Sequence, residues 1–269
     1  MKITAIIRTE LWQRRRALLF WSLGVAALVG IDMLLYTTVK GQAQDLNRAL
    51  SHLPLTFKSL FADNADFLSP AGFLSARVYY LLLPLVLTIF TIGLGSSLIG
   101  KEEQQGTLEL LLSRPVSRLK LLLSKITAGT LATALLALVA LVVGLICLKI
   151  VGFDGVSARA VAFVTLEAVI LSSLFGAIAL CLSSIGGPFR NMSTGVAALI
   201  AFSAYLLASL ENVASWIAWP ARLLPYHYYH PSAVLEGSSY GLKPMLGYFI
   251  IAVGLLVCAW AGFRRRDIG

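Results

Sequence analysis

The chain has 269 residues, of which 58% are hydrophobic and 13% are charged, and its mean hydropathy is +0.83. Soluble globular domains carry charge on about 25% of their residues, so this composition excludes a soluble domain and indicates an integral membrane protein. The net charge of +9 is compatible with nucleic-acid binding, but membrane proteins also carry Lys and Arg as orientation signals.

Six apolar runs are each long enough to cross the hydrocarbon layer as a helix of about 20 residues. They lie at 17–39, 78–99, 126–148, 161–185, 192–210 and 244–263. The runs are continuous and do not alternate polar and apolar residues, which excludes a membrane β-barrel. We therefore expect an all-α polytopic membrane protein in which 1–269 forms a single transmembrane domain.

Residues 1–16 precede the first run and combine basic side chains with an apolar stripe at Ile3, Ile7 and Leu11. This helical spacing predicts an amphipathic helix at the membrane interface. An unstructured basic leader that only sets topology is the alternative. The first run is too long for a signal-peptide core, so we expect it to be retained as a membrane helix.

The basic residues predict the orientation of the chain. If both termini are cytoplasmic, fourteen of the 22 Lys and Arg residues fall in cytoplasmic segments, namely 1–16, 100–125, 186–191 and 264–266. The positive-inside rule favours this orientation. It also accounts for the basic excess, so we expect no nucleic-acid partner.

The outside segment 40–77 is rich in Phe and Leu, which favours short helices on the outer membrane face over a flexible linker. The second run then contains Pro84, which removes one backbone hydrogen bond and is expected to kink the helix.

The sequence GSSLIGK at 95–101 is close to the phosphate-binding pattern GxxxxGK followed by Ser or Thr. The next residue is Glu102, whose carboxylate stands where a hydroxyl would bind magnesium, and an apolar run precedes the motif instead of a strand. We therefore expect no ATP site in this chain.

The segment 100–125 is densely charged and lies between two apolar runs. A short first helix is predicted from an apolar stripe at helical spacing and from acidic residues in its N-terminal half, where the helix dipole favours negative charge. The stripe is Leu108, Leu111 and Leu112, and the acidic residues are Glu102, Glu103 and Glu109. Pro115 ends this helix, and a second helix is predicted to begin after Ser117, a good N-cap. We interpret the segment as a docking surface.

Three stretches carry a resemblance to a known family: GTLELLLSRPVSR at 106–118, GFL at 72–74 and FRRRDIG at 263–269. With them, the chain resembles the permease subunit of an ABC type-2 exporter over essentially its whole length. The resemblance implies that ABC ATPase subunits, which hold the ATP and magnesium, dock at 100–125, called the coupling segment below. It also implies a second permease chain. The coupling residues on this basis are Glu102, Glu103, Gly106, Thr107, Leu108, Glu109, Arg114, Pro115 and Arg118.

Residues 211–243 separate the last two runs and are rich in Trp and Tyr, which favour the membrane interface. We expect a bent, re-entrant segment at the outer leaflet, broken into short pieces at Pro220, Pro225 and Pro231.

Asp32 and Glu167 are the only carboxylates inside the predicted spans. Charged side chains are rare inside the hydrocarbon layer, so both residues are candidates for a functional role. A role in cargo or proton movement is one interpretation. The other is structural, with Asp32 near the outer interface and Glu167 buried against another span.

His227 and His230 are spaced to share one helix face, which is compatible with a metal site. Two histidines alone are too few ligands to form such a site. Interfacial aromatic packing is the favoured interpretation, and we expect no metal. Cys147, Cys181 and Cys258 lie inside the runs without metal or redox spacing, which favours a packing role.

The sequence therefore predicts a non-catalytic permease of an ATP-driven exporter in a prokaryotic cell membrane. A self-sufficient secondary transporter or channel is the alternative, although inverted repeats are not evident. A membrane-bound enzyme lacks a catalytic constellation. The apolar spans favour a hydrophobic or amphiphilic cargo, and membrane lipid and a second copy of the chain are expected partners.

Overall fold

The computed structural model describes residues 3–41, 69–104, 117–186, 188–237 and 242–265, together with residues 54, 56, 59, 60 and 106. Within this part the chain forms helices and no strand. Six helical stretches are long and apolar enough to cross a membrane. The predicted all-α, six-span architecture is confirmed.

Three consecutive elements, α4, η1 and α5, run on as the second span, and the short helices α10, η2 and α11 lie between the last two spans. The elements are α1 (Ile3–Gly41), α4 (Pro70–Leu74), the π-helix η1 (Ser75–Leu82), α5 (Leu83–Gln104), α7 (Arg118–Val151), α8 (Ala158–Ile185), α9 (Pro188–Ser209), α10 (Ser215–Ala221), the 3₁₀ helix η2 (Pro225–Tyr228), α11 (Pro231–Leu235) and α12 (Leu242–Arg265).

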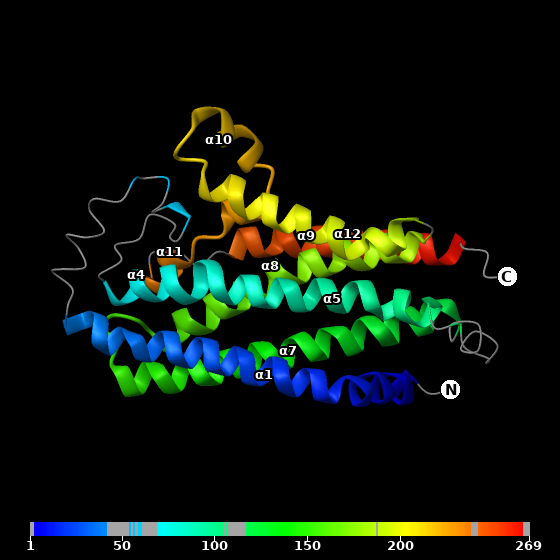
Figure 1. Ribbon diagram of the computed structural model, residues 1–269, viewed down its shortest axis with the longest axis horizontal. Helices are drawn as coiled ribbons and strands as arrows, with labels where there is room; N and C mark the ends of the chain where they lie inside the picture. The colour runs from blue at the N-terminus through cyan, green and yellow to red at the C-terminus, as the bar shows by residue number, and fades with distance from the viewer. Residues whose placement is uncertain are drawn as a thin grey trace.

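The long helices lie side by side in three layers, with α1 and α7 on one side, α5 and α8 in the middle, and α9 and α12 on the other side (Figure 1). In the most apolar stretch of the α5 and α8 spans, 61% of the residues are buried, against 17–33% for the other four. The middle layer is therefore the core. The start of α1 and the end of α12 lie at the same end of the bundle, called the terminal end below (Figure 1).

The middle layer is held by a close crossing of α5 and α8. A Cβ atom added at Gly95 would lie 2.2 Å from the carbonyl oxygen of Gly176, so the two backbones touch at this point. Thr91 Oγ1 donates to the carbonyl of Ser172 at 2.7 Å beside the crossing. Small residues that let backbones approach are typical of helix contacts in membranes. The motif GSSLIGK lies within this helix.

The predicted boundary between an interfacial helix 1–16 and a first span from residue 17 is wrong, because α1 is one helix from Ile3 to Gly41. No proline interrupts this stretch. Glu10 and Arg14 in its N-terminal part have partners on neighbouring helices, described below. A location of 1–16 at the membrane interface stays a prediction.

The second span begins earlier than predicted. Ser69 caps its first turn by accepting a hydrogen bond from the N–H of Gly72 at 2.9 Å, so the outside segment ends before Pro70 and not at residue 77. The π-helix η1 follows, and it ends two residues before Pro84, which cannot donate to the preceding turn. Arg77 is thereby placed inside the span.

The segment between the last two spans forms three short helices, as predicted, two of which begin at Pro225 and Pro231. Pro220 does not mark a boundary, since it lies inside α10 near its end. Helix α10 projects from the side of the bundle (Figure 1) with Trp216 and Trp219 exposed, as is Leu223 just after it, whereas η2 and α11 pack back onto the core. The location of segment 211–243 in the outer leaflet stays a prediction.

The packing role predicted for the cysteines holds for Cys147, which is buried, and not for Cys258, which is exposed on α12. Cys181 is partly buried, and all three are free thiols.

Candidate functional site

The described parts of the coupling segment 100–125 are the last turn of α5 and the first turns of α7, and both lie at the terminal end. Thr107, Leu108, Glu109, Arg114 and Pro115 lie outside the described residues, as does the predicted leucine stripe. Its second helix is confirmed, because Ser117 has extended backbone angles and its hydroxyl accepts a hydrogen bond from the N–H of Lys120.

Glu102 and Glu103 occupy a different position from the predicted one. They lie in the last turn of α5, which ends at Gln104, and not at the start of a short separate helix. Gly106 follows with φ of +65°, a left-handed conformation typical of glycine just beyond a helix end.

Next to the coupling segment, three helices are joined by a network of charged side chains. Lys125 Nζ on α7 lies 3.1 Å from Glu10 Oε2 on α1, and Arg14 Nε lies 2.7 Å from Glu10 Oε1. Arg14 Nη1 also donates to Ser97 Oγ on α5 at 2.9 Å. Lys125 is 2% exposed and Glu10 8% exposed. We call these four residues the charged network.

The charged network lies at one level in the bundle. Glu10, Lys125 and Ser97 are each seven residues from the helix end that faces the terminal side, or about 11 Å at 1.5 Å per residue. Removing one partner of a buried ion pair costs about 3–5 kcal/mol, because a charge is left without compensation. The network therefore fixes α1, α5 and α7 relative to one another beside the coupling segment.

Asp32 has a partner that the sequence did not indicate. Arg77 Nη2 and Nε lie 2.6 and 3.1 Å from Asp32 Oδ1, which joins α1 to η1. Asp32 is buried, whereas the Arg77 side chain is 51% exposed. Because the sequence places Arg77 in the outside segment, its pairing with an intramembrane carboxylate could not be foreseen.

Glu167 on α8 is 3% exposed and lies close enough to Tyr248 on α12 to interact with it electrostatically. It is buried against other spans, as the structural interpretation requires. The structure does not bring Glu167 and Asp32 into one site, since each has its own neighbours on different helices. A role for either in cargo or proton movement stays a prediction.

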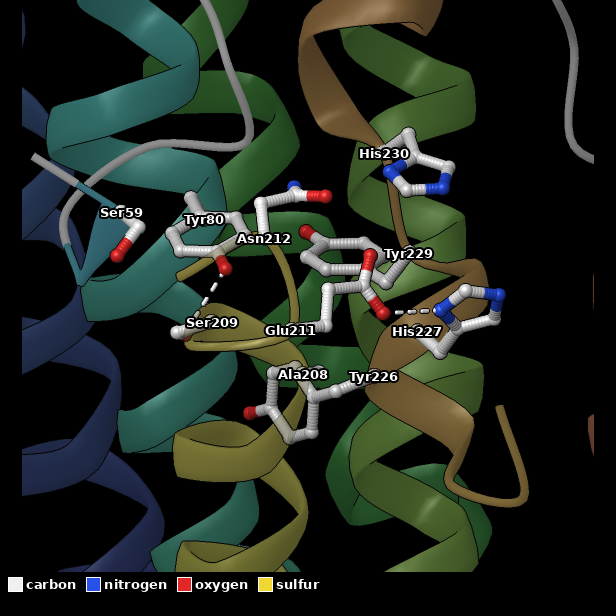
Figure 2. Close-up of a pocket in the computed structure, with 10 residues that line it drawn as sticks. All are labelled: Ser59, Tyr80, Ala208, Ser209, Glu211, Asn212, Tyr226, His227, Tyr229 and His230. Carbon is white, nitrogen blue, oxygen red and sulfur yellow. Dashed lines mark hydrogen bonds and ion pairs between the residues drawn. The ribbon is translucent and has the colours of Figure 1, made fainter. Parts of the chain in front are cut away.

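A small polar pocket lies at the opposite end of the bundle, where η1, the end of α9 and η2 meet (Figure 2). Its volume is about 20 Å³, which is enough for one water molecule. The carboxylate of Glu211 forms an ion pair with Nδ1 of His227, and the hydroxyls of Tyr80 and Ser209 share a hydrogen bond of 2.9 Å. The pocket is lined by Ser59, Tyr80, Ala208, Ser209, Glu211, Asn212, Tyr226, His227, Tyr229 and His230.

Aromatic side chains surround this pocket and hold the re-entrant segment on the core. Tyr226 stacks on Phe175 of α8 and meets Tyr205 and Tyr229 edge to face, with ring centroids 5.7–6.2 Å apart. Tyr229 donates a hydrogen bond of 2.6 Å to the carbonyl of Tyr79. Burial raises the pKa of the Tyr226 phenol above its ordinary value, so this phenol stays neutral.

The pair His227 and His230 has ring centroids 6.5 Å apart, and His227 also packs edge to face on Tyr228. Among the residues that the structure describes, no group of three or more His, Cys, Asp or Glu is placed to hold a metal ion. The contact of His227 with Glu211 and Tyr228 agrees with the packing interpretation.

Sequence reasoning missed Glu10, Arg77 and Glu211. Only the first had a detectable signal, since Glu10 and Arg14 stand four residues apart and such pairs meet on one helix face. The partners Lys125, Asp32 and His227 come from other elements, which a sequence pattern does not reveal.

A family model described as ABC-2 family transporter protein matches residues 4–267 of the chain. No curated protein matches the chain. The family match spans all six membrane helices, the coupling segment and the re-entrant segment.

Proposed function

The chain belongs to the ABC-2 family of transporter membrane proteins, and from this premise we propose that it is the permease of an ATP-driven exporter in a prokaryotic cell membrane. It moves a hydrophobic or amphiphilic cargo outward, along a path formed with a second permease chain. Separate ATPase subunits bind and hydrolyse ATP. The permease supplies the path and the docking surface.

The observation that carries the proposal is the arrangement at the terminal end. The coupling segment connects α5, half of the core layer, to α7, and the charged network joins both to α1. A displacement of the coupling segment by a bound ATPase is therefore passed to three spans as one body. Alternating-access movements of this kind need rigid elements that shift together.

The orientation follows from the basic residues. The start of α1, the end of α5, the start of α7 and the end of α12 lie at one end of the bundle, and they carry ten of the fourteen basic residues counted above. We assign this end to the cytoplasm by the positive-inside rule. Cysteines introduced at positions 52 and 227 should then react with an impermeant reagent in intact cells, and reaction only after permeabilisation would reverse the assignment.

A second permease chain is supported by the large exposed apolar faces of α1, α9 and α12, which one copy leaves open. We propose a homodimer. Lipid covers whatever part of these faces the partner does not.

The experiment that tests the function is purification of the tagged chain from native membranes in a mild detergent. We expect an ATPase with an intact phosphate loop to co-purify, with two permease chains per complex by native mass spectrometry. Transport by the purified chain alone in vesicles, driven by an ion gradient and without ATP, would instead establish a secondary transporter.

A further inference from the structure

A groove of about 300 Å³ lies between α7 and α12, over the crossing of α5 and α8. Its floor is the contact of Gly95 with Gly176, and its walls include Gly129 on α7 and Val253 on α12. The volume is at the lower end of the roughly 300–1,000 Å³ found for small-molecule sites. Because the floor is a backbone contact, the groove is a fixed feature of the core.

The groove offers an apolar surface. No charged residue lines it among the described residues, and the hydroxyls of its threonines are bonded to backbone carbonyls. Thr91 donates to Ser172, Thr130 to Ile126 and Thr133 to Gly129, at 2.7–3.0 Å. Water would find few partners here. A single hydrocarbon chain fits both the chemistry and the size.

The groove lies in the half of the bundle nearest the terminal end. On α5, α7 and α12, the nearest lining residue is about 9–14 Å from the terminal end of its helix, and the farthest is about 20–24 Å from it, at 1.5 Å per residue. Thr130 and Val253 on its rim are exposed. The groove therefore opens sideways to the hydrocarbon of one leaflet.

Two arginines stand over the groove at the membrane surface. Arg118 precedes Gly129 by eleven positions on α7, and Arg264 follows Val253 by eleven positions on α12. Eleven residues make three helical turns, so each arginine shares the groove-facing side of its helix at a distance of about 16 Å. Arg118 Nη1 lies 3.4 and 3.3 Å from the carbonyls of Phe263 and Arg264, which brings the start of α7 to the end of α12.

We propose that this groove binds one acyl chain of a phospholipid from the leaflet at the terminal end, with the lipid phosphate at Arg118 and Arg264. The separation of about 16 Å matches half of the roughly 30 Å hydrocarbon layer, which is the span of one lipid from headgroup to chain end. Arginine is well suited to bind phosphate oxygens. An apolar part of a cargo would fill the groove without needing the two arginines.

The test uses the full chain in phosphatidylcholine nanodiscs that contain phosphatidylglycerol with a photoreactive diazirine in its acyl chain. Cross-linked peptides are quantified by mass spectrometry. Ala252→Phe and Ser173→Leu fill the groove from α12 and α8, and Ala134→Phe on the exposed side of α7 is the matched control. The double variant Arg118→Gln and Arg264→Gln removes the phosphate site, with Arg15→Gln and Arg16→Gln as its control.

We expect labelling of groove residues to be lost in both filling variants and retained in Ala134→Phe. The arginine double variant should weaken labelling by about fivefold for each arginine, because a basic residue near an anionic membrane surface contributes about that factor. Unchanged labelling in a well-folded filling variant would overturn the proposal, as would equal labelling of lipid-exposed residues such as Leu138. Labelling that depends on the groove and not on the arginines would overturn the assignment of the lipid phosphate to Arg118 and Arg264. None of these outcomes depends on the ATPase, so the exporter function is tested separately.

Discussion

The two ends of the bundle are held together by different chemistry. At the terminal end, buried charges on Glu10 and Lys125 connect three spans. At the opposite end, aromatic rings and tyrosine hydroxyls hold the re-entrant segment. The ion pairs in this half, Glu211–His227 and Asp32–Arg77, each include a partly exposed side chain. A buried ion pair has one good geometry and resists sliding, whereas ring packing tolerates small shifts. From this comparison we expect α1, α5 and α7 to move as one body at the terminal end. We expect the re-entrant segment at the other end to rearrange more easily.

The largest expected effect is on the charged network. Lys125→Met should lower the free energy of unfolding by about 3–5 kcal/mol, because Glu10 loses its partner on α7. Thermal unfolding of the detergent-purified protein measures the loss. Lys120→Met, an exposed lysine one turn away, should change stability by less than about 0.5 kcal/mol.

A companion variant separates pairing from packing. The double variant Glu10→Gln with Lys125→Met replaces both members of the buried ion pair by neutral residues. The double variant should therefore be more stable than Lys125→Met alone, in which the Glu10 carboxylate stays charged. A double variant as unstable as the sum of both single changes would show that the pair has no special role, and the contrast between the two ends would fail.

The second effect concerns docking at the terminal end. Glu102→Lys with Glu103→Lys should leave membrane insertion normal and abolish ATPase association or cargo-stimulated ATP hydrolysis, because attraction becomes repulsion at the contact. Each exposed ion pair contributes only about 0–1 kcal/mol, which is why both residues must be reversed.

The matched control reverses two exposed carboxylates at the opposite end, Asp154→Lys with Glu236→Lys, which changes the net charge equally. We expect this variant to keep the ATPase. Equal loss in both double variants would point to a general effect of charge, and wild-type hydrolysis by the Glu102 and Glu103 variant would remove the reason for placing the ATPase there.

A third, smaller effect is expected where the re-entrant segment meets the core. Tyr229→Phe removes one buried hydrogen bond to the carbonyl of Tyr79, which should cost about 1 kcal/mol. Thermal unfolding again measures the change, and Tyr228→Phe, whose hydroxyl bonds at an exposed position, is the control. A loss as large as that of Lys125→Met would mean that this end is as rigid as the other.

The smallest effect is expected at the Glu211–His227 pair. Because both side chains are only partly buried, Glu211→Gln should lower stability by no more than about 1 kcal/mol. If the opposite end rearranges during transport, this variant should alter the transport rate more than the melting temperature. A change in melting temperature alone would give the pair a purely structural role.

The sequence by itself determined the class and the number of spans, because hydropathy over about 20 residues decides which segments cross a membrane. It also placed features that depend on a few neighbouring residues. The N-cap at Ser117 and the short helices that begin at Pro225 and Pro231 follow from local backbone chemistry, so they were predictable.

Only the tertiary structure decided which faces of the helices meet. The helix boundary expected near residue 16 failed because Glu10 and Arg14, which look like surface charges in the sequence, find partners on α5 and α7. Arg77 likewise became an intramembrane partner once the second span began at Pro70. In an apolar chain almost every helix face is hydrophobic, so the pattern does not show which face is buried. Contacts between residues far apart in the sequence choose among those faces, and these contacts exist only in the folded bundle.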